Sequence, residues 1–457
     1  MDRRDFLKNM AAGIAGLTIS KALGNIPSHK EGEMKEKPNI IFILADDLGY
    51  RDLGCYGQER IKTPNIDRMA EEGLRFSQCY TGSPICAPSR CVLMTGKHTG
   101  HATVRDNFAK VGGVLILDNG PPQRRVPLKP EDITVAQVLK KAGYATGITG
   151  KWGLGEPGTE GVPNRKGFDE WFGYLNQRRA HTYYPPFLWR NEEKVILNGK
   201  RYSHDLFTDF ALDFIRTHKD GPFFLYLAYT LPHPKYEIPS VEPYADEPWP
   251  EEAKVYAAMV TRLDGDVGRI LNLLKELDID ERTILFFCSD NGAGRRWEGL
   301  FDSSGPLRGG KGEVYEGGIR TPMIVRWKGR VPAGTLSDAV WYFADFLPTA
   351  ADLAGVEPPA DVDGISLLPT LLGRDQPELR ERFLYWEFPG HGYQQAARVG
   401  DWKAVRPKWG EPLELYDLSK DISERNNLAE RYPEVVERIE EYMKGARVNS
   451  EYWPTPD

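Results

Sequence analysis

The chain has 457 residues, a formal net charge of −7 and five cysteines, with 40% hydrophobic and 27% charged residues. This composition excludes a disordered chain, a disulfide scaffold and a generic binder of nucleic acid or anionic membrane, because phosphate contacts need clustered Lys and Arg. The length indicates two domains, or one large α/β domain with an appendage. The 46 glycines and 34 prolines predict many long loops, where functional sites usually lie.

The first 24 residues are predicted to be an export signal. Arg3 and Arg4 precede a short apolar run over 10–19, and small residues at 22 and 24 stand where a signal peptidase cleaves. The arginine pair favours a twin-arginine signal, with a Sec-type signal as the alternative, and both place the protein in the periplasm or outside the cell. No cysteine follows the run, and no stretch of about 20 apolar residues is present, so we expect no stable membrane anchor. The polar residues 25–37 are expected to form a linker.

Continuous apolar runs of strand length follow along the chain. Runs of this kind are typical of strands buried on both faces of a sheet, and they lie at 39–45, 145–149, 222–229, 283–288 and 323–327. Between them, residues 134–142 and 251–277 have apolar positions at helical spacing. This alternation predicts an α/β fold over 38–355, with a mostly parallel central sheet sandwiched by helices.

The pattern changes after Gly355. Short strand-like segments at 383–387, 396–399 and 402–405 precede a predicted helix over 433–444, whose first residue is a proline. We therefore predict a smaller α+β subdomain over 356–457 that contains a short antiparallel sheet.

Titratable or chelating side chains follow four of the predicted strands. In chain order they are Asp46 and Asp47, then Lys151, then His233, and finally Asp290 with Asn291. Ligands of an open α/β sheet bind at the carboxyl ends of its strands, so these side chains are expected to converge. One Asp after a strand is usually a helix cap, but four such strand ends indicate a site. The aspartates and the asparagine offer only oxygen ligands, which suit Ca²⁺ or Mg²⁺.

Cys86 lies just before a predicted helix start at Pro88. A helix N-terminus stabilises an anionic nucleophile and binds tetrahedral oxyanions, and Arg90 would add a positive charge in the first turn. The alternative is an ordinary cysteine packed beneath a helix start.

The segment Cys86-x-Pro88-Ser89-Arg90, followed by Leu93 and Thr95-Gly96, resembles the signature of the type I, formylglycine-dependent sulfatases of the alkaline phosphatase superfamily. The resemblance extends over most of the chain, through segments in the family's order at 45–50, 63–67, 150–152, 232–233, 289–292, 308–312, 415–418 and 427–429. It implies an exported sulfatase that acts on a sulfated saccharide.

The resemblance also implies two cofactor properties. Cys86 would be oxidised to formylglycine by a separate maturase, and the hydrated aldehyde would be the nucleophile. One Ca²⁺ would be bound by the modified Cys86 together with Asp46, Asp47, Asp290 and Asn291.

Catalytic roles follow from the same resemblance. Asp290 is the candidate for taking the proton of the nucleophile, and Arg90 would hold the formylglycine side chain. Lys151 and Lys311 would neutralise charge on the sulfate, while His233 would protonate the leaving sugar oxygen as a general acid.

One position departs from the family pattern. Many members have Lys-Trp-His-Leu-Gly where this chain has Gly153 in place of the histidine. A glycine cannot act as that histidine's base or sulfate ligand, and His181 is a candidate substitute by sequence only.

Substrate-binding residues are expected outside the signature. Residues 177–184 carry guanidinium, imidazole and aromatic groups that suit sugars, and we expect Arg178, His181 and Arg308 to bind the substrate. His181 in this setting resembles sulfatases that act on galactose or N-acetylgalactosamine glycans.

Two other functions stay open at this point. A phosphoester or phosphonate hydrolase of the same superfamily would usually carry Ser or Thr as nucleophile and bind two metals. A glycan-binding protein without turnover is motivated by Gly153.

Among the remaining cysteines, a bridge between Cys79 and Cys91 is an alternative to free thiols.

Overall fold

The computed structural model describes residues 37–117 and 120–456. The predicted signal peptide lies outside these residues, as does the predicted linker except for Lys37. Within the described residues, no helix combines the length and the apolar character needed to cross a bilayer.

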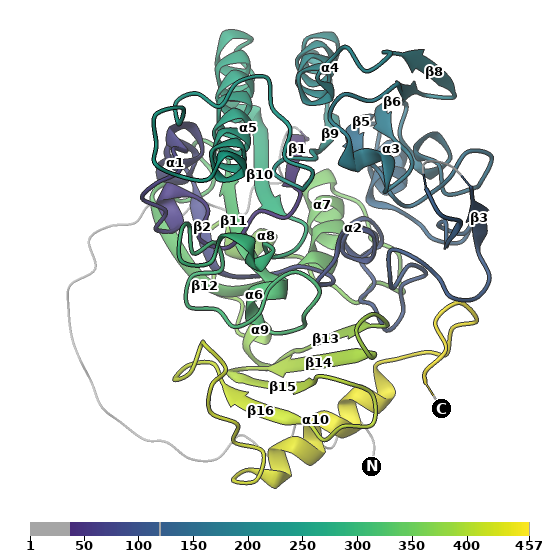
Figure 1. The fold of residues 1–457 in the computed structure, drawn as a ribbon, viewed down its shortest axis with the longest axis vertical. Coiled ribbons are helices and arrows are strands. Elements are labelled where there is room, and N and C mark those ends of the chain that lie inside the picture. The colour runs from purple at the N-terminus through teal and green to yellow at the C-terminus, as the bar shows by residue number, and fades with distance from the viewer. Residues whose placement is uncertain (1–36, 118–119, 457) are drawn as a thin grey trace. The chain divides into compact units, whose positions relative to one another are not determined.

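Within the described residues, ten strands form one mixed sheet with the order β12-β2-β11-β10-β1-β9-β5-β6-β7-β8 (Figure 1). The five middle strands are mutually parallel: β10 (Thr283–Ser289), β1 (Asn39–Ala45), β9 (Phe223–Ala228), β5 (Ala145–Lys151) and β6 (Glu170–Tyr174). The outer strands are β12 (Thr335–Tyr342), β2 (Leu74–Tyr80) and β11 (Arg320–Arg326) on one side, with β7 (Phe187–Arg190) and β8 (Glu193–Ile196) on the other. The predicted α/β architecture with a parallel centre is confirmed.

Helices cover both faces of this sheet (Figure 1). One layer contains α1 (Pro64–Glu71), α4 (Ser203–His218) and α5 (Glu251–Glu276), and the other contains α2 (Cys86–Thr95), α3 (Val135–Lys141) and α7 (Phe346–Ala354). Shorter described elements are the hairpin of β3 (Val114–Ile116) and β4 (Gln123–Arg125), and helices α6 (Glu316–Ile319), α8 (Leu368–Leu371) and α9 (Glu378–Glu381).

The first strand shows why a continuous apolar run predicts a central strand. All residues of β1 are buried. Ile41 and Ile43 join the core that includes residues of α4 and α5, whereas the ring of Phe42 lies 4.5 Å from that of Phe346 in α7. Since each face of the strand meets a helix layer, polar alternation is absent from its sequence.

The outer strands β2 and β12 were not predicted. Strand β2 mixes buried and partly buried residues in the sequence LRFSQCY, and the first six residues of β12 are all partly or fully exposed. Their polar positions hide the strand signal that the central runs carry, because one side of an outer strand contacts solvent. Helix α4 was also not predicted, although many of its residues are apolar.

The C-terminal part contains an antiparallel sheet and one long helix. Its described strands are β13 (Phe383–Phe388), β14 (Gln394–Val399), β15 (Trp402–Arg406) and β16 (Glu414–Asp417), in that order, and α10 (Pro433–Gly445) packs on them. The first part of the fold ends with α7, where Gly355 takes a left-handed conformation (φ 68°). The described residues pack as one unit, so a subdomain boundary near 356 stays a proposal.

A buried ionic network joins the C-terminal sheet to the rest of the fold. The Nζ atom of Lys403 on β15 lies 2.9 Å from a carboxylate oxygen of Glu316 in α6 and 2.9 Å from one of Glu424. All three side chains are fully buried. The remaining oxygen of Glu424 accepts a hydrogen bond from the Glu316 amide at 2.7 Å. Arg320 pairs with the other oxygen of Glu316 at 3.1 Å, but Lys403 is the cation that the two glutamates share.

We expect Lys403→Met to lower the free energy of unfolding by about 3–5 kcal/mol. Methionine keeps the apolar stem but leaves two buried carboxylates without their shared cation. Chemical denaturation followed by circular dichroism measures this loss. The matched control is Lys420→Met, because Lys420 is 81% exposed and pairs only with Asp417 within the described residues. Its unfolding midpoint is expected to stay at the wild-type value, and equal midpoints for both variants would contradict the prediction.

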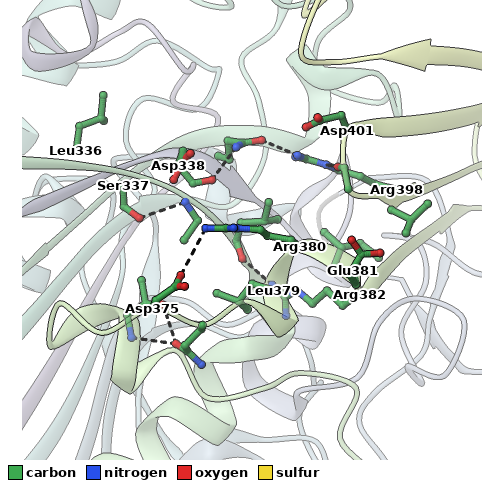
Figure 2. Close-up of a pocket in the computed structure, with 18 of the residues that line it drawn as sticks. Leu336, Ser337, Asp338, Asp375, Leu379, Arg380, Glu381, Arg382, Arg398 and Asp401 are labelled. Atoms are coloured by element: carbon green, nitrogen blue, oxygen red, sulfur yellow. Dashed lines mark hydrogen bonds and ion pairs between the residues drawn. The ribbon is translucent and has the colours of Figure 1, made fainter. Parts of the chain in front are cut away.

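A groove of about 860 Å³ lies between β12 and the C-terminal sheet (Figure 2). Its wall includes the exposed side chain of Leu336 on β12, Arg380 and Arg382 near α9, and Arg398 with Asp401 near the β14–β15 turn. None of the predicted site residues lines it. The groove is therefore separate from the predicted site.

Candidate active site

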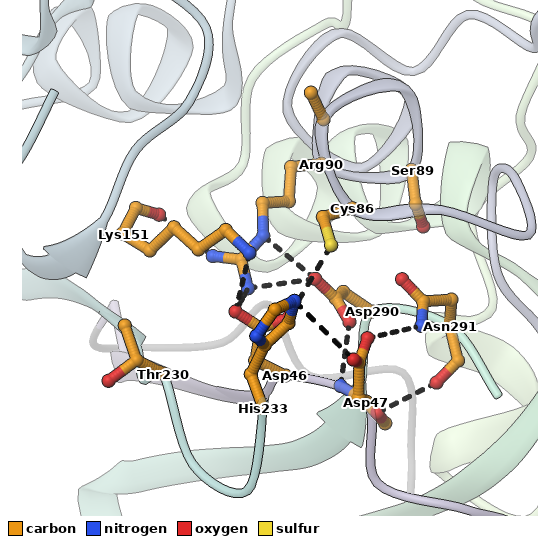
Figure 3. Close-up of polar contacts among 12 residues, drawn as sticks. Asp46, Asp47, Cys86, Ser89, Arg90, Lys151, Thr230, His233, Asp290 and Asn291 are labelled. Carbon is orange, nitrogen blue, oxygen red and sulfur yellow. Dashed lines mark hydrogen bonds and ion pairs between the residues drawn. The ribbon is translucent and has the colours of Figure 1, made fainter. Parts of the chain in front are cut away.

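The predicted catalytic and metal-binding residues converge at one edge of the sheet (Figure 3). Strands β10, β1, β9 and β5 are consecutive neighbours, so the residues that follow their carboxyl ends come together. These residues are Asp290 and Asn291, Asp46 and Asp47, His233, and Lys151, which is the last residue of β5. Helix α2 begins at Cys86 beside them.

Three oxygen-bearing residues are linked directly. The Asp47 amide donates to Oδ1 of Asp290 at 3.2 Å, and Nδ2 of Asn291 donates to Oδ1 of Asp47 at 2.8 Å. The Oδ1 atom of Asn291 is buried and has no hydrogen-bond partner among the described residues. A buried carbonyl oxygen without a donor calls for a ligand, and a cation satisfies it.

The residues present fit a hard divalent cation. Asp46, Asp47, Cys86 and His233 each place a ligand atom within 4.8 Å of the others. Together with Asp290 and the free amide oxygen of the neighbouring asparagine, the aspartates form a set of hard oxygen donors of the kind that Ca²⁺ takes.

Cys86 is the first residue of α2 and is 1% exposed. Its Sγ lies 3.5 Å from Oδ1 of Asp46. The helix start is held by Asn107, whose Oδ1 accepts a hydrogen bond from the Ala87 amide at 2.9 Å. Burial raises the pKa of the Cys86 thiol to about 12, against the opposing charges of the nearby lysines. An unmodified thiol therefore stays protonated at neutral pH and is a poor nucleophile.

Arg90 links the helix to two strand ends. Its Nε and Nη2 donate to Oδ2 of Asp290 at 3.0 and 2.8 Å, and its Nη1 donates to the Lys151 carbonyl at 2.7 Å. Burial, together with the negative charge of Asp46, raises the pKa of Asp290 to about 6 against the opposing charges of Arg90 and Lys151.

Two lysines and a histidine complete the cluster. Lys151 Nζ lies 2.6 Å from Oδ2 of Asp46, and Lys311 Nζ lies 2.6 Å from Oδ2 of Asp47. Lys311 Nζ also lies 3.0 Å from Nε2 of His233, while the other ring nitrogen contacts the Pro234 carbonyl. The Nδ1 atom therefore carries the ring proton, and Nε2 accepts from Lys311.

Asp46 and His233 both have pKa values shifted well below the ordinary ones. Burial would raise the pKa of Asp46, but Lys151 and the other nearby cations outweigh burial and hold it well below its usual range. Burial, followed by the charge of Lys311, keeps the pKa of His233 well below its ordinary value. In this state Asp46 is ionised and His233 is neutral.

The three predicted substrate-binding residues differ in position. The His181 ring stacks on His233, with centroids 3.9 Å apart, so His181 belongs to the cluster. Arg178 donates to the Pro121 carbonyl at 2.9 Å. The guanidinium of Arg308 lies over the ring of Tyr315 and donates to the hydroxyl of Tyr416, so it is engaged with the C-terminal part. Binding of substrate by these residues stays a prediction.

A second group of possible metal ligands lies after α2. It consists of His98, His101 and Asp363. The Gly100 amide donates to Nδ1 of His98 at 3.2 Å, so the proton of the neutral ring is on Nε2, which faces the Asp363 carboxylate. Nδ1 of His101 lies 2.8 Å from the same carboxylate. Burial lowers the pKa of His98 to about 4, so the His98 ring is neutral, and the two histidines form a hydrogen-bonded clamp around the Asp363 carboxylate.

All five cysteines are described, and all are free thiols. The alternative bridge between Cys79 and Cys91 is therefore not formed. Cys79 instead has its Sγ 3.7 Å from that of Cys288.

Some residues near the site were missed from the sequence. Asn107 orients the start of α2 by accepting a hydrogen bond from the Ala87 amide, which lies 20 positions earlier in the sequence. The Nη2 atom of Arg125 donates to the carbonyl of Gly153. No spacing rule predicts such contacts, because they depend on how loops cross the sheet edge. The Gln177 side chain fills the space beside Gly153.

Known proteins match both the fold and the sequence. The model of the family described as "Sulfatase" matches residues 38–356, and that described as "N-sulphoglucosamine sulphohydrolase, C-terminal" matches 310–449. An N-acetylgalactosamine-6-sulfatase from Canis lupus familiaris is 34% identical over 86% of this chain and 76% of its own length. An N-acetylgalactosamine-6-O-sulfatase from Bacteroides thetaiotaomicron is 30% identical over 95% of this chain and 98% of its length.

The chain also resembles solved structures. The structure of Ps i-CgsB in complex with k-i-k-neocarrahexaose has a TM-score of 0.79 and 29% identity, covering 92% of this chain and 95% of that chain. Fold and site together define a hydrolase of the alkaline phosphatase superfamily. The chain belongs to the sulfatase family, and it is a sulfuric ester hydrolase.

Proposed function

We propose that this protein is an exported, Ca²⁺-dependent sulfatase that releases sulfate from a sulfated saccharide, with formylglycine made from Cys86 as its nucleophile. The observation that carries the proposal is the place of Cys86. It opens α2 within reach of Asp46, in a site that also contains two lysines and a histidine. Export is supported by the arginine pair and apolar run of the first 24 residues.

The Ca²⁺ would be held by Asp46, Asp47, Asp290, Asn291 and the modified Cys86. Bound there, it would supply Lewis-acid charge that lowers the pKa of a hydroxyl and polarises the sulfuryl group. Support comes from the oxygen donors and the unpartnered amide oxygen of Asn291. Formylglycine would supply one hydroxyl for attack and a second hydroxyl from which the aldehyde is regenerated as sulfate leaves.

The remaining residues have distinct tasks in this proposal. Asp290, with its pKa near neutrality, takes the proton of the attacking hydroxyl, and Arg90 fixes the orientation of Asp290. Lys151 and Lys311 hold positive charge where the sulfate binds. His233 gives a proton from Nε2 to the leaving sugar oxygen, and that proton first reaches Nε2 from the ammonium group of Lys311, which donates to it.

The substrate is proposed to be a galactose- or N-acetylgalactosamine-type glycan. Two of the relatives that cover most of the chain are an N-acetylgalactosamine-6-sulfatase and an N-acetylgalactosamine-6-O-sulfatase, and Ps i-CgsB was solved with a neocarrahexaose. His181 stacks on the proposed general acid, next to where the leaving sugar would lie. Arg178 and Arg308 are further proposed contacts.

Protein made in a host with a formylglycine-generating maturase is expected to release sulfate from defined 6-sulfated galactose or N-acetylgalactosamine saccharides. The peptide that contains Cys86 is expected to show the mass of formylglycine. Sulfate release by fully active protein with only intact Cys86 would rule out the nucleophile. Faster turnover of phosphate esters would favour a phosphoester hydrolase, and tight glycan binding without release would favour a binding protein.

A further inference from the structure

The space of the family histidine at position 153 is filled by another residue. Gly153 has a left-handed backbone (φ 77°), and an added Cβ would overlap Oε1 of Gln177. The segment after β6 runs beside the segment after β5, since the Gly153 amide donates to the Leu175 carbonyl at 3.3 Å. Gln177 therefore enters this space from the neighbouring strand end, 24 positions later in the sequence.

The amide of Gln177 is buried and unsatisfied. The residue is 0% exposed, and neither Oε1 nor Nε2 has a hydrogen-bond partner among the described residues. A buried amide left in this way costs about 1–3 kcal/mol per group, so such groups usually have a partner. A ligand with oxygen atoms would supply the missing hydrogen-bond partner.

Arg125 presents a second unsatisfied donor at the same place. Its Nη2 donates to the Gly153 carbonyl at 2.5 Å and its Nε lies 3.3 Å from Glu156, but Nη1 is buried with no partner among the described residues. The guanidinium Nη2 would lie 3.8 Å from a Cβ at Gly153. Two unused donors, one neutral and one cationic, therefore lie beside Gly153.

This place adjoins the reacting atoms. Gly153 is two residues after Lys151, whose Nζ bonds Asp46, and Arg125 is close enough to Cys86 for the two side chains to interact electrostatically. An oxyanion bound at Cys86 would thus lie within the field of Arg125.

We propose that Gln177 and Arg125 form a sulfate-binding element that takes the place of the absent histidine. Nε2 of Gln177 and Nη1 of Arg125 donate to sulfate oxygens, and Oε1 of Gln177 is left to accept from a hydroxyl. The inference rests on the proposed function in that the bound anion is the sulfate being transferred. An amide exchanges no proton at neutral pH, so this element binds the anion and leaves proton transfer to other groups.

The test is Gln177→Leu, assayed for sulfate release and for inhibition by inorganic sulfate. Leucine has similar volume but no donor, so kcat/KM is expected to fall about 10- to 100-fold and the inhibition constant of sulfate to rise about 10-fold or more. The melting temperature is expected to stay equal or rise, because the native amide has no internal hydrogen bond to lose.

The matched control is Gln395→Leu. Its buried amide donates to the Tyr385 hydroxyl at 2.6 Å and accepts from Arg406 at 2.7 Å. This control is expected to lower the melting temperature while keeping kcat/KM and sulfate inhibition. A structural role for Gln177 would give the control's pattern instead, and that result overturns the inference.

Gln177→Glu is the second variant and keeps the size and shape of the side chain. A carboxylate would repel sulfate and pair with Arg125, so the inhibition constant is expected to rise more than for leucine. Unchanged kcat/KM and unchanged sulfate inhibition in both variants overturn the inference.

If wild-type protein releases no sulfate from any ester, the proposed function fails, and titration calorimetry with inorganic sulfate decides the inference separately. Binding by wild type that both variants lose supports it. Equal binding by all three proteins, or no binding by wild type, overturns it.

Discussion

Replacing Cys86 with alanine is expected to reduce sulfate release to background, at least about 10⁴-fold below wild type. Alanine lacks the thiol that the maturase would oxidise, so Cβ cannot become the formylglycine aldehyde and no group remains to attack the sulfur. The charges that bind sulfate stay in place, because Lys151 and Lys311 are held by Asp46 and Asp47. Sulfate release and titration calorimetry with inorganic sulfate measure the two effects, and only the first is expected to be lost.

Cys91→Ala is the matched control for this variant. Cys91 lies on the same helix and is fully buried, but none of its hydrogen bonds reaches the residues of the site. Both alanine variants are expected to lose a similar, small amount of stability, whereas only Cys86→Ala loses turnover. Activity of Cys86→Ala within tenfold of the Cys91→Ala value would remove Cys86 as the nucleophile.

Replacing His233 with alanine is expected to slow the release of sulfate from saccharides by about 10²–10⁴-fold, with a much smaller effect on activated aryl sulfates. A sugar alkoxide is a poor leaving group and needs a proton as the S–O bond breaks, whereas a nitrophenolate does not. The measurement is a plot of kcat/KM against leaving-group pKa for wild type and variant. The variant is expected to depend more steeply on that pKa.

His101→Ala provides the comparison. His101 belongs to the clamp around Asp363 and is partly exposed. Any loss that this variant causes is expected to be equal for aryl and saccharide substrates. If His233→Ala also affects both substrate classes equally, His233 positions the sulfate and is not the general acid.

Much of the site was predictable because its residues follow strong local signals. Asp46 follows a strand whose every residue is buried, and Asp290 follows another such strand. The two strands are parallel neighbours, with Ala45 opposite Ser289 in the register. Parallel strands end at the same edge, so adjacency in the sheet converts two distant sequence signals into one cluster.

Other parts required the folded chain. The outer strands carry polar residues and give no strand signal, and Arg308 is directed to Tyr315 and Tyr416 by packing that its own segment does not encode. The neighbours of His233 were also unpredictable, since Lys311 reaches it across 78 positions.

By itself, the sequence determined the class of fold and indicated which strand ends carry the candidate site residues, because hydrophobic periodicity and short motifs act over a few residues. Only the tertiary structure decided which residue fills the space beside Gly153. Gln177 reaches it because two neighbouring strands end side by side, and Arg125 reaches it from a separate hairpin. Such contacts follow from the three-dimensional path of the loops, which local sequence patterns do not specify.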